Sequence, residues 1–396
     1  MPRGPQAPAW IALLLALGPA CGGPAPAPAQ EGTPIARTEG APIPDAEGWR
    51  WVPFPDSTCT DAVADPATGR YRFTTSTTGL AIRWGTSADL VVFLNGGGAC
   101  WDFVTCGGAA PFVDKTASTG PFGPAEFARD VYARYPASWI QRENLPASIA
   151  GATVVFVPYC TGDVHGGDRV ETYTGPGGSV TWHHVGRANV LAFLRRLGPT
   201  FPSPHRLVVA GSSGGGFGTL ASYVAFRDRW PGARAYLVDD SAPPLVNDAV
   251  PRATRERWYA SWDLGLSLDP FCPGCREDLS QGLVELLRRY PADRIALVSH
   301  LRDAVIRGFY GNFGTAPLSS APFVGPMPAD RFEAELRRLA ATVIDPASNG
   351  RYLFTAGDRH PALDDPTQEA TPSPGLSAWL EQMLSDSPEW ASAADP

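Results

Sequence analysis

Residues 206–223, RLVVAGSSGGGFGTLASY, constrain the fold more than any other stretch of the chain. An apolar run stops at Gly211-Ser212-Ser213-Gly214-Gly215, after which small and apolar residues resume with helical spacing. The pattern matches G-x-S-x-G between a strand and a helix, the context in which this motif forms a sharp turn. Side chains two residues before and two after Ser213 would collide in that turn, so glycine is needed at both positions. We therefore expect a buried strand, a strained turn that projects the Ser213 hydroxyl from the sheet, and a helix.

Apolar runs alternate with helical patterns from residue 90 to residue 385. The apolar runs predict strands at 90–98, 153–160, 206–211, 233–240, 294–301 and 351–357. Helical spacing predicts helices at 181–198, from the serine turn (residues 211–215) to about 227, and at 279–290, 332–343 and 376–384. Shorter runs at 49–54 and 71–77 predict edge strands. Strands that alternate with helices favour an α/β fold with a mostly parallel sheet and helices on both faces.

The first residues have the features of an export signal. Arg3 provides a short positive region, and residues 9–18 are apolar but too few to span a bilayer. Cys21 stands where a bacterial lipoprotein carries its acylated cysteine, and simple secretion with cleavage nearby is the alternative. Residues 22–47 are rich in Pro, Ala and Gly, which predicts a disordered tether. We expect a signal peptide at 1–20, a tether at 21–47 and a single domain at 48–396, exported as a bacterial cell-envelope lipoprotein or secreted.

Apart from Cys21, the chain has an even number of cysteines: Cys59, Cys100, Cys106, Cys160, Cys272 and Cys275. In an exported chain this predicts three disulfides, whose pairing the cysteine count leaves open. Zinc is the alternative, because Cys272 and Cys275 form a CxxC pair. No second CxxC or paired-histidine motif accompanies it, so the sequence predicts no metal site. The formal net charge of −8, without a Lys/Arg cluster, argues against a nucleic-acid partner.

Ser213 is the candidate nucleophile, and it needs a proton acceptor and donors for an oxyanion. Asn95-Gly96-Gly97-Gly98, here called the glycine loop, follows the first core strand and resembles loops that lend backbone N–H groups to an oxyanion. An ordinary tight turn is the alternative for this loop. A phosphate-binding loop is the alternative for the serine turn, but no GK[ST] follows it and no GxGxxG stands in frame.

His360 is the candidate base, because it follows the last predicted strand. In α/β-hydrolases the catalytic residues occur in the order Ser, then Asp or Glu, then His, and His360 fits this order best. His165 lies in a loop that could border a cleft. Of the other histidines, His183 and His184 fall in a predicted helix and His205 precedes the serine-turn strand, so all three come before Ser213 in the sequence. His300 ends a later strand.

Asp303 is the preferred acid, because it follows a strand and precedes His360. Asp240 ends the strand after the serine turn and is the alternative acid. It could instead be a capping carboxylate at that strand end. Asp358 is only two residues from His360, and so close a neighbour rarely points into the same hydrogen bond.

Several motifs together resemble the pectinacetylesterase and Notum family of carboxylesterases. The matching segments are LNGGGACWDFVTC, VVFVPYCTGDVHGG, AGSSGGG, LRDAVI and the late His360, and they span roughly Cys59 to His360. The chain differs from the family pattern at Gly214, where alanine is usual, and at Pro361, where cysteine is usual.

The resemblance implies an α/β-hydrolase fold with Ser213 as nucleophile, Asp303 as acid and His360 as base. It also implies that the oxyanion donors are the backbones of Gly97, Gly98 and Gly214. The disulfides that it implies are Cys59–Cys160, Cys100–Cys106 and Cys272–Cys275.

The expected function is that of a serine carboxylesterase, without metal or organic cofactor, that releases acetyl or short acyl groups from a polysaccharide. A fatty acyl ester is the closest alternative substrate, and another serine hydrolase shares the same residues. A third possibility is a non-catalytic protein on this fold that stacks sugars on Trp101, Trp182, Trp258 and Trp262. The expected partner is an acylated small molecule or polysaccharide, with membrane contact only through lipid on Cys21.

Overall fold

The computed structural model describes residues 30–31, 41–109, 115–176, 178–246, 249–311 and 326–396. The predicted signal peptide, Cys21 and most of the predicted tether lie outside these residues. Ile43, which the sequence assigns to the tether, is 3% exposed, and its N–H donates to Thr200 Oγ1 at 2.8 Å. The packed part of the chain therefore begins before Trp49.

The strands confirm the predicted alternation and extend the two front strands well beyond their predicted ends. They are β1 (Gln30–Glu31), β2 (Trp49–Ala64), β3 (Tyr71–Arg83), β4 (Leu90–Leu94), β5 (Thr153–Val157), β6 (Arg169–Gly175), β7 (Gly178–His184), β8 (Arg206–Ser212), β9 (Arg234–Asp240), β10 (Arg294–His300), β11 (Gly350–Thr355) and β12 (Ala393–Ala394).

Nine α-helices occur among the described residues: α1 (Pro124–Glu126), α2 (Gly186–Thr200), α3 (Gly214–Arg229), α4 (Arg252–Trp262), α5 (Gly265–Leu268), α6 (Ser280–Arg289), α7 (Ala304–Tyr310), α8 (Ala329–Leu339) and α9 (Leu376–Leu384). Short 3₁₀ and π turns join them: η2 (Phe127–Tyr132), η3 (Arg142–Asn144), η4 (Ala147–Ile149), η6 (Pro273–Arg276), η7 (Ala340–Ile344) and η8 (Pro366–Gln368). None of these described helices is long and apolar enough to cross a bilayer.

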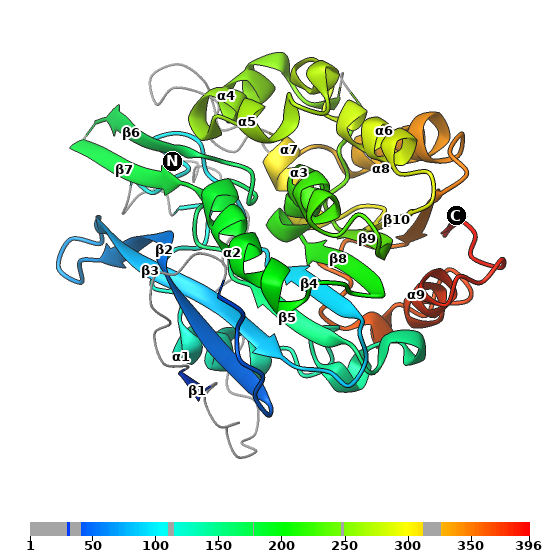
Figure 1. The fold of residues 1–396 in the computed structure, drawn as a ribbon. Coiled ribbons are helices and arrows are strands. Elements are labelled where there is room, and N and C mark those ends of the chain that lie inside the picture. Colours follow the sequence, from blue (N-terminus) through cyan, green and yellow to red (C-terminus); the bar gives the residue numbers. More distant parts are fainter. Residues whose placement is uncertain (1–29, 32–40, 110–114, 177, 247–248, 312–325) are drawn as a thin grey trace.

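In the described part of the chain, ten strands form one sheet in the order β1-β2-β3-β5-β4-β8-β9-β10-β11-β12. Its pairs are parallel from β5 through β12, whereas β3 is antiparallel to both β2 and β5. The strands β6 and β7 form a separate antiparallel hairpin, which projects beside the sheet in Figure 1. The parallel order β4-β8-β9-β10-β11 brings the loops after these strands to one edge.

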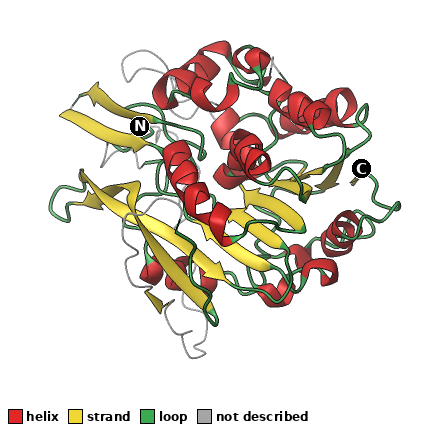
Figure 2. Cartoon of the chain, in the orientation of Figure 1, coloured by secondary structure: helices red, strands yellow, loops and turns green. Residues whose placement is uncertain are grey.

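The core has two parts because the central strands are buried on both faces. Val92 and Leu94 of β4 pack in one cluster, whereas Val91 and Phe93 pack in the other. The first cluster includes residues of α2, α3, α6 and α8, and the second includes residues of η2 and α9. Figures 1 and 2 show α2 and α3 lying across one face of the sheet, with α9 apart from them. This arrangement confirms the predicted fold class, an α/β sheet covered on both faces.

The helix predicted at 181–198 is wrong in its first turns. Residues up to His184 belong to β7, and α2 begins at Gly186. Val180, Trp182 and His184 are buried while their neighbours are more exposed. That period of two is typical of a strand. His183 and His184 therefore lie on a strand and not on a helix.

Candidate active site

The serine turn has the strained geometry that its sequence predicts. Ser213 has φ 60° and ψ −124°, outside the regions that side chains favour, and it is the N-cap of α3. A Cβ on Gly211 would lie 2.3 Å from the Gly215 carbonyl oxygen, and one on Gly215 would lie 2.0 Å from that of Leu94. Neither distance is possible for a real side chain, so the turn requires glycine at both positions. Strain of this kind is concentrated at functional sites.

The glycine loop lies directly against the serine turn. A Cβ on Gly96 would be 2.9 Å from Ser213 Cβ, and one on Gly214 would be 3.0 Å from the Gly98 carbonyl oxygen. Gly98 has φ +73° and lies so close to Thr116 that a side chain would meet the Thr116 carbonyl. Among the described residues, none accepts a hydrogen bond from the N–H groups of Gly97, Gly98 or Gly214. These three N–H groups are therefore free to bind an anionic oxygen.

The structure brings His360 and Asp303 together. His360 Nδ1 and Asp303 Oδ2 are 2.8 Å apart, and the Asp303 side chain is fully buried. Asp303 is also the N-cap of α7, where its Oδ1 accepts from the N–H groups of Val305 and Ile306, both at 2.9 Å. One oxygen is thus fixed by the helix while the other faces the imidazole. The hydrogen bond to a carboxylate assigns the proton to Nδ1 and leaves Nε2 as the acceptor.

The electrostatics of His360 reflect two opposing effects. Burial lowers the pKa of His360, but the charge of Asp303 and its hydrogen bond raise it, with further contributions from Asp240 and Asp364. The net effect is a pKa above the ordinary 6.5. The Asp364 carboxyl is itself perturbed, because burial and then the charge of Asp240 raise its pKa to about 7.

The alternative acid, Asp240, has a different set of partners. Its carboxylate accepts from Ser212 Oγ at 2.7 Å, Ser241 Oγ at 2.9 Å, Ala362 N at 3.1 Å and Leu363 N at 2.9 Å. No hydrogen bond joins it to His360 in the described structure. Asp240 therefore connects the serine turn to the loop that follows His360, which brings the ends of β8 and β11 together.

Ser213 and His360 are not hydrogen-bonded to each other in the described structure. Ser213 follows β8, Asp303 follows β10 and His360 follows β11, so all three lie at the carboxyl edge of the sheet. Catalytic hydrogen bonds are often long in unliganded enzymes and tighten when substrate binds. The bonds of Asp240 to Ser212 and to the N–H groups of Ala362 and Leu363 hold the serine turn close to the segment that follows His360.

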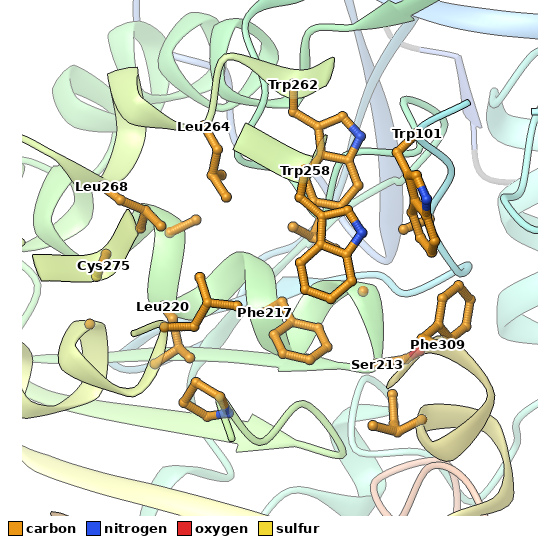
Figure 3. A pocket seen from close by; sticks show the side chains of 18 of the residues that line it. Trp101, Ser213, Phe217, Leu220, Trp258, Trp262, Leu264, Leu268, Cys275 and Phe309 are labelled. Atoms are coloured by element: carbon orange, nitrogen blue, oxygen red, sulfur yellow. The ribbon is translucent and has the colours of Figure 1, made fainter. Parts of the chain in front are cut away.

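An apolar cavity starts at Ser213. The space that it leaves free for the centres of water-sized atoms is about 90 Å³, below the usual range of ligand pockets, so the cavity is narrow. Its wall comes from the glycine-loop side, from α3 to α7 and from η6, and includes Trp101, Phe217, Leu220, Trp258, Trp262, Leu264, Leu268, Cys275 and Phe309. Figure 3 shows Ser213 and Phe309 at one end, Leu268 and Cys275 at the other, and Trp258 between them. A chain of carbon atoms could extend from the serine along this cavity.

The four tryptophans that could stack sugars in a non-catalytic protein on this fold are all buried. Trp101, Trp182, Trp258 and Trp262 are 1%, 0%, 8% and 3% exposed. Three of them line the apolar cavity, where Trp258 and Trp262 are stacked with ring centroids 6.1 Å apart. Trp182 packs instead beside the Cys100–Cys106 pair. Sequence reasoning missed the cavity because its lining residues come from separate elements without a shared motif.

One group of three possible metal ligands occurs among the described residues: Cys100, Cys106 and His184. The two cysteines are joined in a disulfide, and both ring nitrogens of His184 lie within 2.9 Å of other groups, Thr161 O and Tyr173 Oη. Thiolate is the form of cysteine that binds metals, so this group does not fit a metal ion.

The three disulfides are those that the family resemblance implies. Cys59 pairs with Cys160, Cys100 with Cys106, and Cys272 with Cys275. The first joins β2 to the segment after β5, and the second closes a short loop directly after the glycine loop. The third lies at the far end of the apolar cavity, which Cys275 lines.

A mostly parallel sheet with a strained serine turn and an Asp–His pair at its carboxyl edge defines the α/β-hydrolase class of fold. No protein-family model and no curated protein matches the sequence. Two solved structures of the Wnt deacylase Notum from Drosophila are similar to the chain. Crystal form I has a TM-score of 0.51 at 17% identity and covers 89% of this chain and 98% of that chain. Crystal form II has a TM-score of 0.50 at 16% identity, with coverages of 83% and 93%. At this identity the similarity shows the fold, and it is the fold that the motif resemblance implied.

Proposed function

We propose that the protein is a serine carboxylesterase that hydrolyses esters with an apolar acyl chain. The observation that carries this proposal is the apolar cavity that starts at Ser213, a serine held in a strained strand-to-helix turn. An acyl chain in the cavity would bring its ester carbonyl to the Ser213 hydroxyl. Holding the reacting atoms together in this way supplies a large part of the rate enhancement.

The proposed chemistry uses Ser213, His360 and Asp303 as one unit. His360 Nε2 takes the hydroxyl proton as Ser213 Oγ attacks the ester carbonyl, and Asp303 stabilises the imidazolium that forms. The carbonyl oxygen becomes an anion, which the N–H groups of the glycine loop and Gly214 stabilise. His360 then gives its proton to the leaving alcohol, and the acyl group stays on Ser213. A water molecule, deprotonated by His360, releases the acid and restores the serine.

The cavity bears most directly on the size of the acyl group. An acetyl group would occupy only the end of the cavity at Ser213 and leave most of its apolar wall without contact. A longer chain would bury apolar surface along the cavity, at about 25 cal/mol for each Å² removed from water. The cavity therefore favours the fatty acyl alternative over the acetyl or short acyl ester of a polysaccharide. The similar Drosophila structures are named as a Wnt deacylase.

Export is part of the proposal. Three disulfides in one domain are typical of an oxidising compartment outside the cytosol. We propose an exported enzyme, either secreted or held in a bacterial cell envelope by lipid on Cys21.

The test is turnover of p-nitrophenyl esters of graded chain length by the purified protein, beside acetylated pectin and xylan. We expect kcat/KM to rise from acetyl to medium and long acyl esters. Ser213→Ala should lower turnover by several orders of magnitude, because a catalytic triad acts as a unit. Ser212→Ala is the matched control, because it removes a neighbouring hydroxyl that bonds Asp240, and it should keep most of the activity.

Two outcomes would contradict the proposal in different ways. If Ser212→Ala were the inactive variant, the nucleophile would be wrong although the esterase activity would stand. If the wild-type protein turned over none of the esters, the hydrolase assignment would fail, and a binding role for the cavity would replace it.

A further inference from the structure

His165 is a buried histidine that the proposed chemistry does not use. It lies between β5 and β6 and is 2% exposed. Its φ is +59°, and that of Val164 before it is +52°. Two consecutive residues other than glycine in this region are unusual and costly, especially for the β-branched valine. The surrounding contacts must therefore hold this segment in place.

The imidazole of His165 makes one hydrogen bond in the described structure, between Nε2 and the backbone oxygen of Asn95, at 2.8 Å. A carbonyl only accepts, so Nε2 carries the proton and donates it. Burial lowers the pKa of His165 to about 4, so the ring is neutral at ordinary pH. It is therefore a constant donor and not a proton carrier.

Asn95 is the first residue of the glycine loop. Its N–H donates to the Val157 carbonyl at 3.0 Å, and its own carbonyl receives the bond from His165. Further along the loop, the Gly97 carbonyl accepts from Ser118 N at 2.7 Å. The bonds from His165 and Ser118 thus hold two of the loop's carbonyls and orient its peptide planes. The Gly97 carbonyl shares its peptide plane with the Gly98 N–H, one of the free donors, and the Asn95 carbonyl shares its plane with the Gly96 N–H at the start of the loop.

His165 also touches the helix that begins at Ser213. A Cβ on Gly218 of α3 would lie 2.8 Å from His165 Cδ2, so the ring packs directly on the first turns of α3. On its other side the ring contacts Tyr159, with centroids 4.7 Å apart. The imidazole therefore lies between α3 and the glycine loop and contacts both.

A buried carboxylate fixes the backbone of His165. Asp163 Oδ1 accepts from His165 N at 3.2 Å and from Thr161 Oγ1 at 2.6 Å, and its Oδ2 accepts from Gly186 N at 2.7 Å. The Tyr159 hydroxyl accepts from Val164 N at 2.7 Å. These bonds explain how the unusual backbone of residues 164 and 165 is maintained.

We infer that His165 is a positioning residue for the oxyanion donors: its Nε2–H bond to Asn95 and its packing on Gly218 set the spacing between the glycine loop and the N-terminus of α3. The inference rests on the proposed function, since it assigns a role within the same site. Donors on the two elements can stabilise one oxyanion only if their separation is correct, and loss of a single donor costs roughly 100- to 1,000-fold in kcat.

The test compares three variants on one medium-chain p-nitrophenyl ester. His165→Phe keeps a ring and removes the donor, so we expect kcat to fall about 10- to 100-fold. KM should change less than about threefold, because His165 does not line the apolar cavity. His165→Gln keeps an N–H donor of similar reach and should recover most of kcat. His184→Phe is the matched control, because His184 is also buried and bonds the Thr161 carbonyl, but it does not touch the glycine loop.

A boronic acid with the same alkyl chain gives a second measurement, because its adduct with the serine places an oxygen where the oxyanion forms. Its affinity should weaken in His165→Phe by about the same factor as kcat and stay unchanged in His184→Phe. The acid limb of the pH–rate profile should be the same in all variants, since His165 does not titrate in that range.

The inference would be overturned if folded His165→Phe kept kcat within about threefold, or if His184→Phe lost as much. A shifted acid limb would make His165 a base and would also refute the positioning role. If His165→Phe does not fold, His165→Gln and His165→Asn provide the comparison, because only glutamine reaches Asn95. Equal rates for these two amides would then refute the inference. Failure of the proposed function looks different, because the wild-type protein itself would be inactive.

Discussion

His360 is surrounded by more negative charge than the Asp303 carboxylate alone. Asp240 and Asp364 also raise its pKa, and the Asp364 carboxyl has a pKa of about 7. Because both groups titrate in the same range, the apparent values measured by kinetics belong to the pair. The environment of His360 therefore makes a direct prediction about the dependence of activity on pH.

Asp364→Asn should move the acid limb of kcat/KM to lower pH. Only neutral His360 can accept the Ser213 proton, so activity falls as pH drops through the pKa of His360. In the wild-type protein this limb should lie above pH 6.5, and removing the charge of Asp364 should lower it. The measurement is kcat/KM on a p-nitrophenyl ester across a pH range that extends from acid to alkaline. Asp365→Asn, one residue away, is the control and should not shift the limb; an upward shift in Asp364→Asn would contradict the prediction.

Asp239→Asn should stabilise the fold at neutral and higher pH. Asp239 is 2% exposed, its Oδ1 has no hydrogen-bond partner among the described residues, and burial followed by the charge of Asp240 raises its pKa well above 3.8. A carboxyl whose folded-state pKa is raised makes the fold less stable as pH increases above the unfolded-state pKa of about 3.9. Asparagine carries no such penalty, so the melting temperature of the variant should exceed that of the wild type at pH 8, with a smaller difference near pH 4. Exposed Asp228→Asn should show no such pH dependence.

At the residue scale, the local parts of the site could be predicted and the long-range parts could not. The requirement for Gly211 and Gly215 follows from the steric demands of one turn, which a short motif encodes. The choice between Asp303 and Asp240 depends on partners 57 and 122 residues away in sequence, His360 and Ala362. Chain order favoured Asp303 and the family resemblance implied it, but no local pattern contains the contact itself. The structure places Asp303 beside His360.

At the scale of elements, β7 shows where helical spacing misled the prediction. Residues 181–198 have apolar side chains at helical intervals, but the buried positions up to His184 alternate with a period of two. The strand exists because Trp182 packs over the Cys100–Cys106 loop and its Nε1–H donates to Thr161 O at 2.9 Å. These are tertiary contacts, which override local propensity. The alternation of residues 180, 182 and 184 was the available signal.

The helix α6 contributes Gly282 to the wall of the apolar cavity. This glycine lines the far end of the cavity, and a Cβ there would lie 3.3 Å from Cys275 Sγ. Gly282→Leu should fill this end and lower kcat/KM for the longest p-nitrophenyl esters by about tenfold or more, while short esters stay within about twofold. Gly274→Leu, at an exposed position outside the cavity, is the matched control. A uniform loss across all chain lengths would indicate damage to the fold and contradict the prediction.

At the scale of the whole molecule, the site is assembled from distant parts of the chain. The cavity takes its wall from the loop after β4 and from helices between residues 214 and 310. The sheet order brings β4, β8, β10 and β11 together although their sequence positions are far apart. The alternation of elements predicts such a sheet, but it does not predict which helices enclose a cavity at its edge.

The disulfide Cys59–Cys160 should contribute more to stability than Cys272–Cys275. Both pairs are almost completely buried, so replacing either by alanine leaves cavities of similar kind. They differ in sequence separation, which is 101 residues for the first pair and 3 for the second. A disulfide restricts the unfolded chain more when it closes a longer loop, which in the chain-entropy model is worth roughly 4 to 5 kcal/mol for about a hundred residues and roughly 2 kcal/mol for a few. We expect Cys59→Ala/Cys160→Ala to lower the free energy of unfolding about twice as much as Cys272→Ala/Cys275→Ala in denaturant titrations. An equal or greater loss from the short pair would mean that packing at the end of the apolar cavity, and not chain entropy, governs the contribution of these bonds.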